Sequence, residues 1–139
     1  MNLARYNACG VECIIWDLGG INSLWERYYP DCDAIIYVMD STDSTKEMEE
    51  SAKIYESVCS HEIFREREVH VPKIVFMNKL DKENECSYNT ANWKRLFQQQ
   101  QQNGNNDVVN IFGGSAKTGD GIRYAMEFLI LAVIGQKKR

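Results

Sequence analysis

Three short polar segments carry the residue types that could do chemistry, and each follows an apolar run, the third after two glycines. They are Asp17-Leu18-Gly19-Gly20 after residues 11–16, Asn78-Lys79-Leu80-Asp81 after residues 73–77, and Ser115-Ala116-Lys117 after residues 108–112. Apolar runs of this length predict strands, and parallel sheets bind their ligands at the carboxyl ends of the strands. The three segments therefore predict one binding site assembled from three loops.

The second segment has the most specific chemistry, which is that of a purine site. The Asp81 carboxylate can accept two hydrogen bonds from a guanine edge, and Asn78 can hold the loop and a ring nitrogen. The aliphatic stem of Lys79 can cover a ring face. A polar turn that arose by chance is the alternative for this segment.

The other two segments are less specific. Asp17 could hold the water shell of a metal ion, and the glycines after it could bring a backbone N–H close to an anion. A backbone N–H in residues 115–117 could meet a purine carbonyl, with Lys117 against the ring. Each segment alone is also an ordinary turn or helix-entry loop, but three in order, each after its own strand, are poorly explained by coincidence.

The elements that would position these segments alternate between strands and helices. Residues 3–6 and 11–16 predict a hairpin, and residues 34–39, 73–77 and 108–112 predict strands buried on both faces. Helices are expected from Asp43 or Ser44 to about Cys59, over residues 90–102, and from Asp120 to Gly135, while the low-complexity run 98–106 predicts a loop extension. The alternation predicts one α/β domain over residues 1–139, a three-layer sandwich with a mainly parallel sheet.

Each expected helix has an apolar side that should face the sheet. These sides consist of Met48, Ala52, Ile54, Tyr55 and Val58 in the first helix, Trp93, Leu96 and Phe97 in the second, and Ile122, Ala125, Met126, Leu129 and Val133 in the last.

Composition narrows the classes of protein to which the chain can belong. Its 139 residues are 44% hydrophobic and 26% charged with a net charge of −4, which is ordinary for a globular chain and argues against nucleic-acid binding. The five cysteines lack metal-ligand spacing, so reduced thiols are expected in place of a zinc site. The chain has no leader pattern, Asn2 stands where myristoylation needs glycine, and the apolar run 128–134 is shorter than the roughly 20 residues of a membrane span. We expect an intracellular chain with no transmembrane segment.

The whole constellation resembles the small GTPases, and its details resemble the ADP-ribosylation factor (Arf) family among them. Residues 16–20 are similar to the opening of that family's switch II, and residues 23–29 to the helix that follows. Residues 35–43 are most similar to the Arf-related branch associated with the Golgi. The resemblance runs from about Cys9 to the C-terminus and implies a P-loop GTPase-like fold.

The resemblance also implies roles for single residues, with GTP or GDP and Mg²⁺ as the cofactors. Asp17 would bind Mg²⁺ through water, and the Gly20 N–H would meet the γ-phosphate. Asn78 and Asp81 would recognise guanine, and Lys79 would cover the base and sugar. The Ala116 N–H would meet the guanine carbonyl, flanked by Ser115 and Lys117.

The sequence departs from the family's pattern where the phosphates bind. It contains no G-x-x-x-x-G-K-[ST], so the first strand, phosphate loop, first helix and switch I threonine, about 30 residues, are lacking. Ile21 stands where the family usually has a Gln that positions the attacking water. The chain resembles GTP hydrolases, but no catalytic residue is assigned in it.

These departures predict weak nucleotide binding. Four or five charge-assisted hydrogen bonds at about 1.5–3 kcal/mol each amount to roughly 6–15 kcal/mol, whereas a nanomolar complex has about 12 kcal/mol in total. Binding in the millimolar range is therefore expected. The lacking strand would lie between the strands that end at Trp16 and Met39. Its loss would expose two apolar strand edges to pairing, and the sequence does not decide whether the fold closes this gap or leaves it open.

The leading hypothesis is an Arf-like GTP/GDP switch in vesicle or Golgi traffic. Its partners would be guanine nucleotide and the effector and regulatory proteins of membrane traffic, and it would be a cytoplasmic monomer, with peripheral attachment to Golgi membranes left open. One alternative is a degenerate, non-hydrolysing GTPase-like interaction module that presents Trp16, Trp25 and Tyr28 to a partner, although we favour a core position for these aromatics. The other is an inactive product of a truncated gene.

Overall fold

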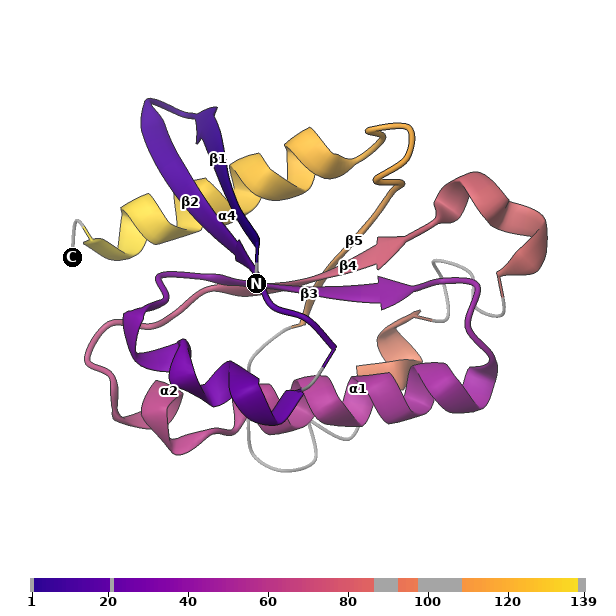
Figure 1. Cartoon of the computed structure of the whole chain (residues 1–139), viewed down its shortest axis with the longest axis horizontal. Helices are drawn as coiled ribbons and strands as arrows, with labels where there is room; N and C mark the ends of the chain where they lie inside the picture. The colour runs from indigo at the N-terminus through magenta and orange to yellow at the C-terminus, as the bar shows by residue number, and fades with distance from the viewer. Residues whose placement is uncertain (1, 21, 87–92, 98–108, 138–139) are drawn as a thin grey trace.

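The strands of the chain form two separate sheets (Figure 1). The computed structural model describes residues 2–20, 22–86, 93–97 and 109–137. β1 (Asn2–Ala8) and β2 (Val11–Asp17) pair as an antiparallel hairpin. β3 (Ile35–Asp40), β4 (Lys73–Asn78) and β5 (Asn110–Gly113) form a parallel sheet in that order. The predicted hairpin and the predicted parallel strands are therefore both present.

Helices cover both faces of the parallel sheet. Figure 1 shows α1 (Thr45–Cys59) on one side of the sheet and α4 (Ile122–Lys137) on the other. The short helix α2 (Glu62–Glu66) follows α1, and four 3₁₀ helices complete the described elements: η1 (Asn22–Arg27), η2 (Tyr29–Asp31), η3 (Leu80–Glu85) and η4 (Trp93–Phe97). The three-layer α/β arrangement agrees with the prediction.

Strand β4 lies at the centre of the core because its side chains are buried on both faces. Val75 and Met77 join one apolar cluster with residues of α1 and η4, and Ile74 and Phe76 join a second cluster with Ala125 and Leu129 of α4. Side chains of a strand alternate between the two faces, so a strand covered on both sides needs a continuous apolar run. The run KIVFM was correctly interpreted as such a strand.

Strand β3 departs from that expectation on one face. Tyr37 and Met39 are buried toward α1, but Val38 on the opposite face is 58% exposed. β3 pairs with β4 alone, so its other edge has no strand partner among the described residues. The prediction of burial on both faces is wrong at Val38. Of the two alternatives that the sequence leaves for the gap, the described residues have the open edge at β3.

The aromatic residues at the end of the hairpin and directly after it do not all lie in the core. Trp25 and Tyr28 are half-buried and Tyr29 is buried, whereas Trp16 is 38% exposed and contacts Tyr28 edge-on at 5.5 Å between ring centroids. A core position for Trp16 is therefore wrong. Its neighbours across the outer hairpin face, Leu3 and Ile14, are more exposed still.

The observed helices differ in their bounds from the helices expected from the sequence. Ser44 caps α1 by accepting a hydrogen bond from the Glu47 amide at 3.2 Å, and the expected residues Met48, Ala52, Tyr55 and Val58 are buried. The last helix begins at Ile122 and continues through Gly135 to Lys137, because a glycine near a helix end does not have to stop it. Of the helix expected over 90–102, residues 93–97 form η4 with Trp93 and Phe97 buried, and the rest, with the loop 98–106, lies outside the described residues.

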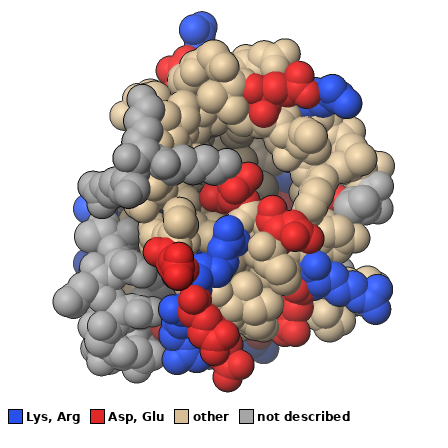
Figure 2. Space-filling view, turned by 90° about the vertical axis from the view of Figure 1, so that its left-hand side faces the viewer, with Lys and Arg blue, Asp and Glu red and all other residues tan. Residues whose placement is uncertain are grey.

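The amino ends of β3 and β4 face the viewer in Figure 2. Lys and Arg side chains are interspersed with Asp and Glu side chains on this face. A pocket at this end is lined by Asp33, Arg67 and His70 among others, which places it opposite the polar segments that follow the strands. Within the described ranges, no helix is long and apolar enough to cross a membrane.

Candidate functional site

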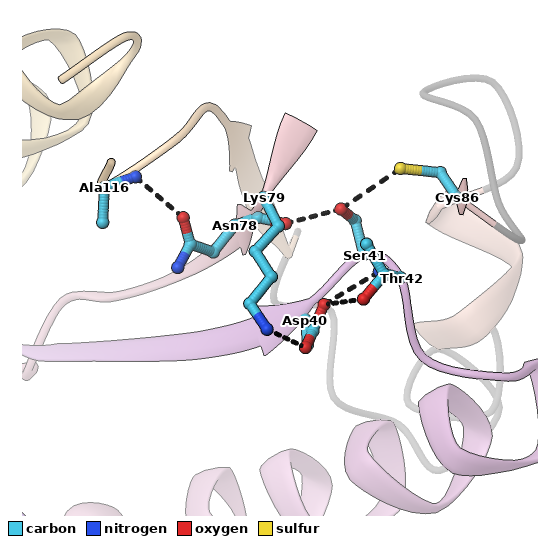
Figure 3. Close-up of polar contacts among 7 residues, drawn as sticks. All are labelled: Asp40, Ser41, Thr42, Asn78, Lys79, Cys86 and Ala116. Atoms are coloured by element: carbon cyan, nitrogen blue, oxygen red, sulfur yellow. Dashed lines mark hydrogen bonds and ion pairs between the residues drawn. The ribbon is translucent and has the colours of Figure 1, made fainter. Parts of the chain in front are cut away.

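The carboxyl ends of the three parallel strands bring two of the three predicted segments into direct contact. Asn78 ends β4, and its side-chain Oδ1 accepts a hydrogen bond from the Ala116 amide at 2.8 Å, in the loop after β5 (Figure 3). The Asn78 carbonyl accepts two more, from the Ser41 amide at 3.1 Å and the Ser41 hydroxyl at 2.5 Å. Asn78 therefore ties the ends of β3 and β5 to the end of β4.

A second contact joins Asp81 to the loop after β5. The Ser115 hydroxyl donates to Asp81 Oδ1 at 2.7 Å, and its oxygen accepts the Thr118 amide at 3.3 Å. Ser115 is 1% exposed, while Asp81 is exposed and its Oδ2 has no hydrogen-bond partner among the described residues. A buried hydroxyl thus holds one oxygen of an exposed carboxylate and leaves the other oxygen without a hydrogen bond to the described residues.

Two glycines allow the loop after β5 to close tightly. A Cβ on Gly114 would lie 2.0 Å from the Asp120 carbonyl oxygen, and one on Gly121 would lie 2.3 Å from the Gly113 carbonyl oxygen. Gly121 also has a φ of +75°, a conformation that favours glycine. The Ser115 amide donates to the Asp120 carbonyl at 3.0 Å across this closure. The close approach fixes the positions of Ser115 and Ala116.

Lys79 leaves β4 in a left-handed conformation and reaches toward β3. Its φ is +67°, and its Nζ lies 2.7 Å from Asp40 Oδ2 (Figure 3). The hydrogen bond to Asp40 raises the pKa of Lys79. Burial raises the pKa of Asp40, but hydrogen bonds from Lys79 and Thr42 outweigh it and hold that pKa below its usual value. Both partners are therefore charged at neutral pH.

The first predicted segment lies apart from the other two. Asp17 ends β2 and Gly20 follows it, and both are exposed. In Figure 1 the arrowhead of β2 lies away from those of β3 and β4. No hydrogen bond or ion pair joins Asp17 or Gly20 to the residues of the other two segments in the described part of the chain. The structure brings together the residues predicted to bind guanine and leaves those predicted to bind Mg²⁺ and phosphate separate.

The predicted metal ligand fits only a site completed by other groups. Within the described ranges, no three or more His, Cys, Asp or Glu side chains gather where they could hold a metal ion. Mg²⁺ keeps several waters and commonly uses one or two carboxylates together with substrate phosphates. A single exposed Asp17 fits that mode of Mg²⁺ binding. It does not fit a metal site built from protein ligands alone.

Sequence reasoning did not include a further polar segment at this end of the sheet, the one that follows β3. Asp40, Ser41 and Thr42 directly follow the apolar run 34–39, so the rule that identified the other segments would have included them. In the structure, Asp40 pairs with Lys79 and Ser41 bonds to Asn78. Cys86 donates to the Ser41 hydroxyl oxygen at 3.3 Å, which connects it to the same network.

The loop after β5 carries two further predicted residues, Ala116 and Lys117. The Ala116 amide, predicted to meet a guanine carbonyl, donates to Asn78 Oδ1, so a ligand would have to share or replace this bond. Lys117 is exposed beside it. Together, the site offers an exposed carboxylate, an amide side chain and two lysine stems, which suit the edge and the face of a planar, hydrogen-bonding ring.

Comparison with known proteins gives a consistent assignment. The family model of the ADP-ribosylation factor family matches residues 2–133. Human ADP-ribosylation factor-related protein 1 is 32% identical over 138 residues, which cover 96% of this chain and 65% of the relative. ADP-ribosylation factor-like protein 3 of Saccharomyces cerevisiae is 29% identical over 126 residues, covering 88% of this chain and 60% of the relative. The chain thus spans less than two thirds of the length of these curated relatives.

A solved structure supports the same fold. The Arl6 BBS3 small GTPase from Trypanosoma brucei, solved with the bound nucleotide analogue GppNp, superimposes with a TM-score of 0.82 at 23% identity. The match covers 97% of this chain and 80% of that chain. On the family model and this shared fold, the chain belongs to the ADP-ribosylation factor family of small GTPases.

Proposed function

We propose that this chain binds the guanine base of GDP or GTP at the carboxyl ends of β4 and β5. The observation that carries the proposal is the Ser115–Asp81 hydrogen bond of 2.7 Å, because it holds an exposed carboxylate in a fixed direction. Guanine presents two donors, its N1–H and its 2-amino group, on one edge. A carboxylate has acceptor capacity for both, in addition to the bond from Ser115.

The neighbouring residues take complementary roles in this proposal. Asn78 fixes the loop that carries Ala116, and its amide nitrogen is available to a ring nitrogen. The stems of Lys79 and Lys117 cover the two faces of the ring. The Ala116 amide meets the guanine carbonyl when the ligand shares the bond to Asn78.

The phosphate side of the site has fewer donors in this chain. Gly20 can offer its backbone N–H to a phosphate, because a glycine has no side chain to block the approach. Asp17 can hold Mg²⁺ through water, and the ion would neutralise phosphate charge when bound. Because these two residues lie apart from the guanine side, we propose that the base supplies most of the affinity and that binding is weak.

The biological role follows from family membership as a further proposal. The protein acts as a GTP/GDP switch in vesicle or Golgi traffic, works as a monomeric single domain over residues 1–139, and meets effector and regulatory proteins at the cytoplasmic face of membranes. The support is the match of residues 2–133 to the family and the similarity to ADP-ribosylation factor-related protein 1. No hydrolytic residue is assigned to this chain.

An NMR titration of the isotope-labelled chain tests the guanine site directly. Guanosine, GDP, GTP and ADP are added separately, with and without Mg²⁺. We expect dissociation constants in the millimolar range for the three guanine compounds, within about threefold of each other, and weaker binding of ADP. Equal binding of ADP and GDP would contradict the guanine site. Submicromolar, Mg²⁺-dependent binding would contradict only the proposed weakness.

A pair of variants makes the titration specific to Asp81. Asp81→Asn keeps an oxygen for Ser115 but turns one acceptor into a donor, so affinity for GDP should fall about tenfold or more. Asp120→Asn removes the same charge from the end of the same loop, where the side chain is exposed. It should leave affinity unchanged.

A second candidate function rests on the outer face of the hairpin. Leu3 and Ile14 are 63% and 61% exposed, and Trp16, which pairs with Leu3, is 38% exposed. Such a surface suits a non-hydrolysing interaction module. Capture of a purified family effector that is unaffected by GDP or GTP, and is abolished by Ile14→Asp, would favour this function.

A further inference from the structure

The contact between Lys79 and Asp40 differs from the two pairs that arginine makes with glutamate in the described chain. The pairs Arg5–Glu12 and Arg123–Glu127 have side-chain exposures of 74% and 49%, and of 86% and 40%. In the Lys79–Asp40 pair the values fall to 46% and 28%, and the pair joins the ends of two neighbouring strands. Exposed ion pairs contribute little to stability and do not hold their side chains in a fixed geometry. A partly buried pair can contribute to stability and can also hold its two side chains in place.

The Asp40 carboxylate is itself held in place. Its Oδ1 accepts two hydrogen bonds from Thr42, one from the amide at 2.9 Å and one from the hydroxyl at 2.6 Å. Its Oδ2 accepts the bond from Lys79 at 2.7 Å. Figure 3 shows the lysine side chain extending from the end of β4 down to this carboxylate. Both oxygens are therefore engaged, and the Lys79 ammonium has one defined location.

The Lys79 side chain needs the bond to Asp40 if it is to point in one direction. A non-glycine residue at a φ of +67° costs free energy, and such conformations persist where the surroundings hold them. A long lysine side chain otherwise samples many rotamers, and ordering it on a ligand lowers affinity. An anchor at Asp40 orders the stem before the ligand arrives.

We propose that Asp40 is a positioning residue of the guanine site, which acts by holding the Lys79 stem where the base docks. The proposal rests on the proposed binding of guanine between the β4 and β5 ends. Asp40 does not touch the base, and Thr42 supports Asp40. The Asp40-Ser41-Thr42 segment thereby contributes to nucleotide affinity from a strand that carries none of the guanine contacts.

A double-mutant cycle tests the proposal on the full chain. Asp40→Asn, Lys79→Met and the double variant are titrated with GDP by NMR, with thermal unfolding as the check on folding. We expect Asp40→Asn to weaken GDP binding about threefold to tenfold, the equivalent of ordering one long side chain. In the Lys79→Met background, Asp40→Asn should have no further effect. An equal loss in both backgrounds would overturn the proposal, because Asp40 would then act without Lys79.

Two further variants keep the test decisive if Asp40→Asn unfolds. Thr42→Val retains the carboxylate and removes only its hydroxyl donor, so it should weaken GDP binding by a smaller factor than Asp40→Asn. Glu127→Gln breaks the exposed pair with Arg123 and should change nothing. Unchanged binding in folded Thr42→Val and folded Asp40→Asn would overturn the proposal.

A readout without nucleotide separates this inference from the proposed function. The acylation rate of Lys79 by an amine reagent, followed by mass spectrometry at neutral pH, should rise in Asp40→Asn while that of Lys117 stays constant. If the wild-type chain binds no guanine compound, the proposed function fails whatever this rate is. If the wild-type chain binds GDP but the Lys79 rate and the affinity are both unmoved by Asp40→Asn, the positioning role alone fails.

Discussion

The indole N–H of Trp25 donates a hydrogen bond to the carbonyl oxygen of Gly19 at 2.9 Å. The ring of Trp25 also contacts Tyr37 of β3 edge-on, with 6.2 Å between ring centroids, and the Tyr37 hydroxyl bonds to Ser51 in α1. This chain of contacts links the loop after β2 to the parallel sheet. One tryptophan therefore ties the loop proposed to meet the phosphates to the core.

Replacing Trp25 tests this link. Trp25→Phe keeps an aromatic ring against Tyr37 but loses the bond to Gly19, so the free energy of unfolding should fall by about 1 kcal/mol. Trp16→Phe is the matched control, because Trp16 is partly exposed and makes a ring contact but no hydrogen bond in the described chain. Urea unfolding measures both. Equal losses would contradict the importance of the Gly19 bond.

Two glycine substitutions should change the free energy of unfolding in opposite directions. Gly114→Ala places a Cβ 2.0 Å from the Asp120 carbonyl oxygen, so it should destabilise the chain by up to about 3 kcal/mol. Gly135→Ala lies in α4 with nothing within 4 Å of the new Cβ, and should stabilise the chain by up to about 1 kcal/mol. Thermal or urea unfolding checks both, and a neutral Gly114→Ala would show that the loop can open without cost.

The Asp40–Lys79 pair predicts a pH dependence of stability. The pKa of Asp40 in the folded chain lies below its ordinary value of 3.8, so the charged carboxylate stabilises the fold above that pH. This stabilisation is lost as the pH falls through the folded-state pKa. Wild type should therefore be more stable than Asp40→Asn at pH 7, and the difference should shrink as the pH drops below 3.8. A constant difference down to pH 2 would contradict the pairing.

The open edge of β3 predicts that the proposed monomer associates at high protein concentration, and that an added charge suppresses this association. Val38 is 58% exposed on that strand, and unpaired apolar edges are templates for pairing with other chains. Val38→Lys should reduce concentration-dependent association in sedimentation experiments. Val69→Lys adds the same charge at a residue that is 46% exposed but lies outside any strand. Equal effects of the two variants would indicate a general effect of charge rather than edge pairing.

The fold was predictable where one residue pattern decides the structure. The run KIVFM predicts β4 because only a strand covered on both faces needs every side chain to be apolar. The similar run AIIYVM misleads at Val38, because burial depends on what covers the strand and no local pattern encodes that. Helix ends were less predictable, since Gly135 is compatible with both a stop and a continued helix.

The candidate site was predictable as a set of loops but not as a network. Strand ends predicted that Asn78 and Ala116 would lie together, and the structure joins them. The bonds of Asp40 to Lys79 and Thr42 depend on the left-handed backbone of Lys79, which sequence spacing does not reveal. The separation of Asp17 from this network likewise depends on the placement of a whole sheet.

The division of the strands into two sheets also bears on how the chain opens. The hairpin joins residues close together in sequence, and most of its side chains are exposed or half-buried, whereas β4 is buried on both faces and pairs with distant segments. Amide protons of β4 should then exchange with solvent only on global unfolding, and those of β1 and β2 through local opening. The chain would then show two classes of exchange rate, with the strand that leads into Asp17 in the faster class.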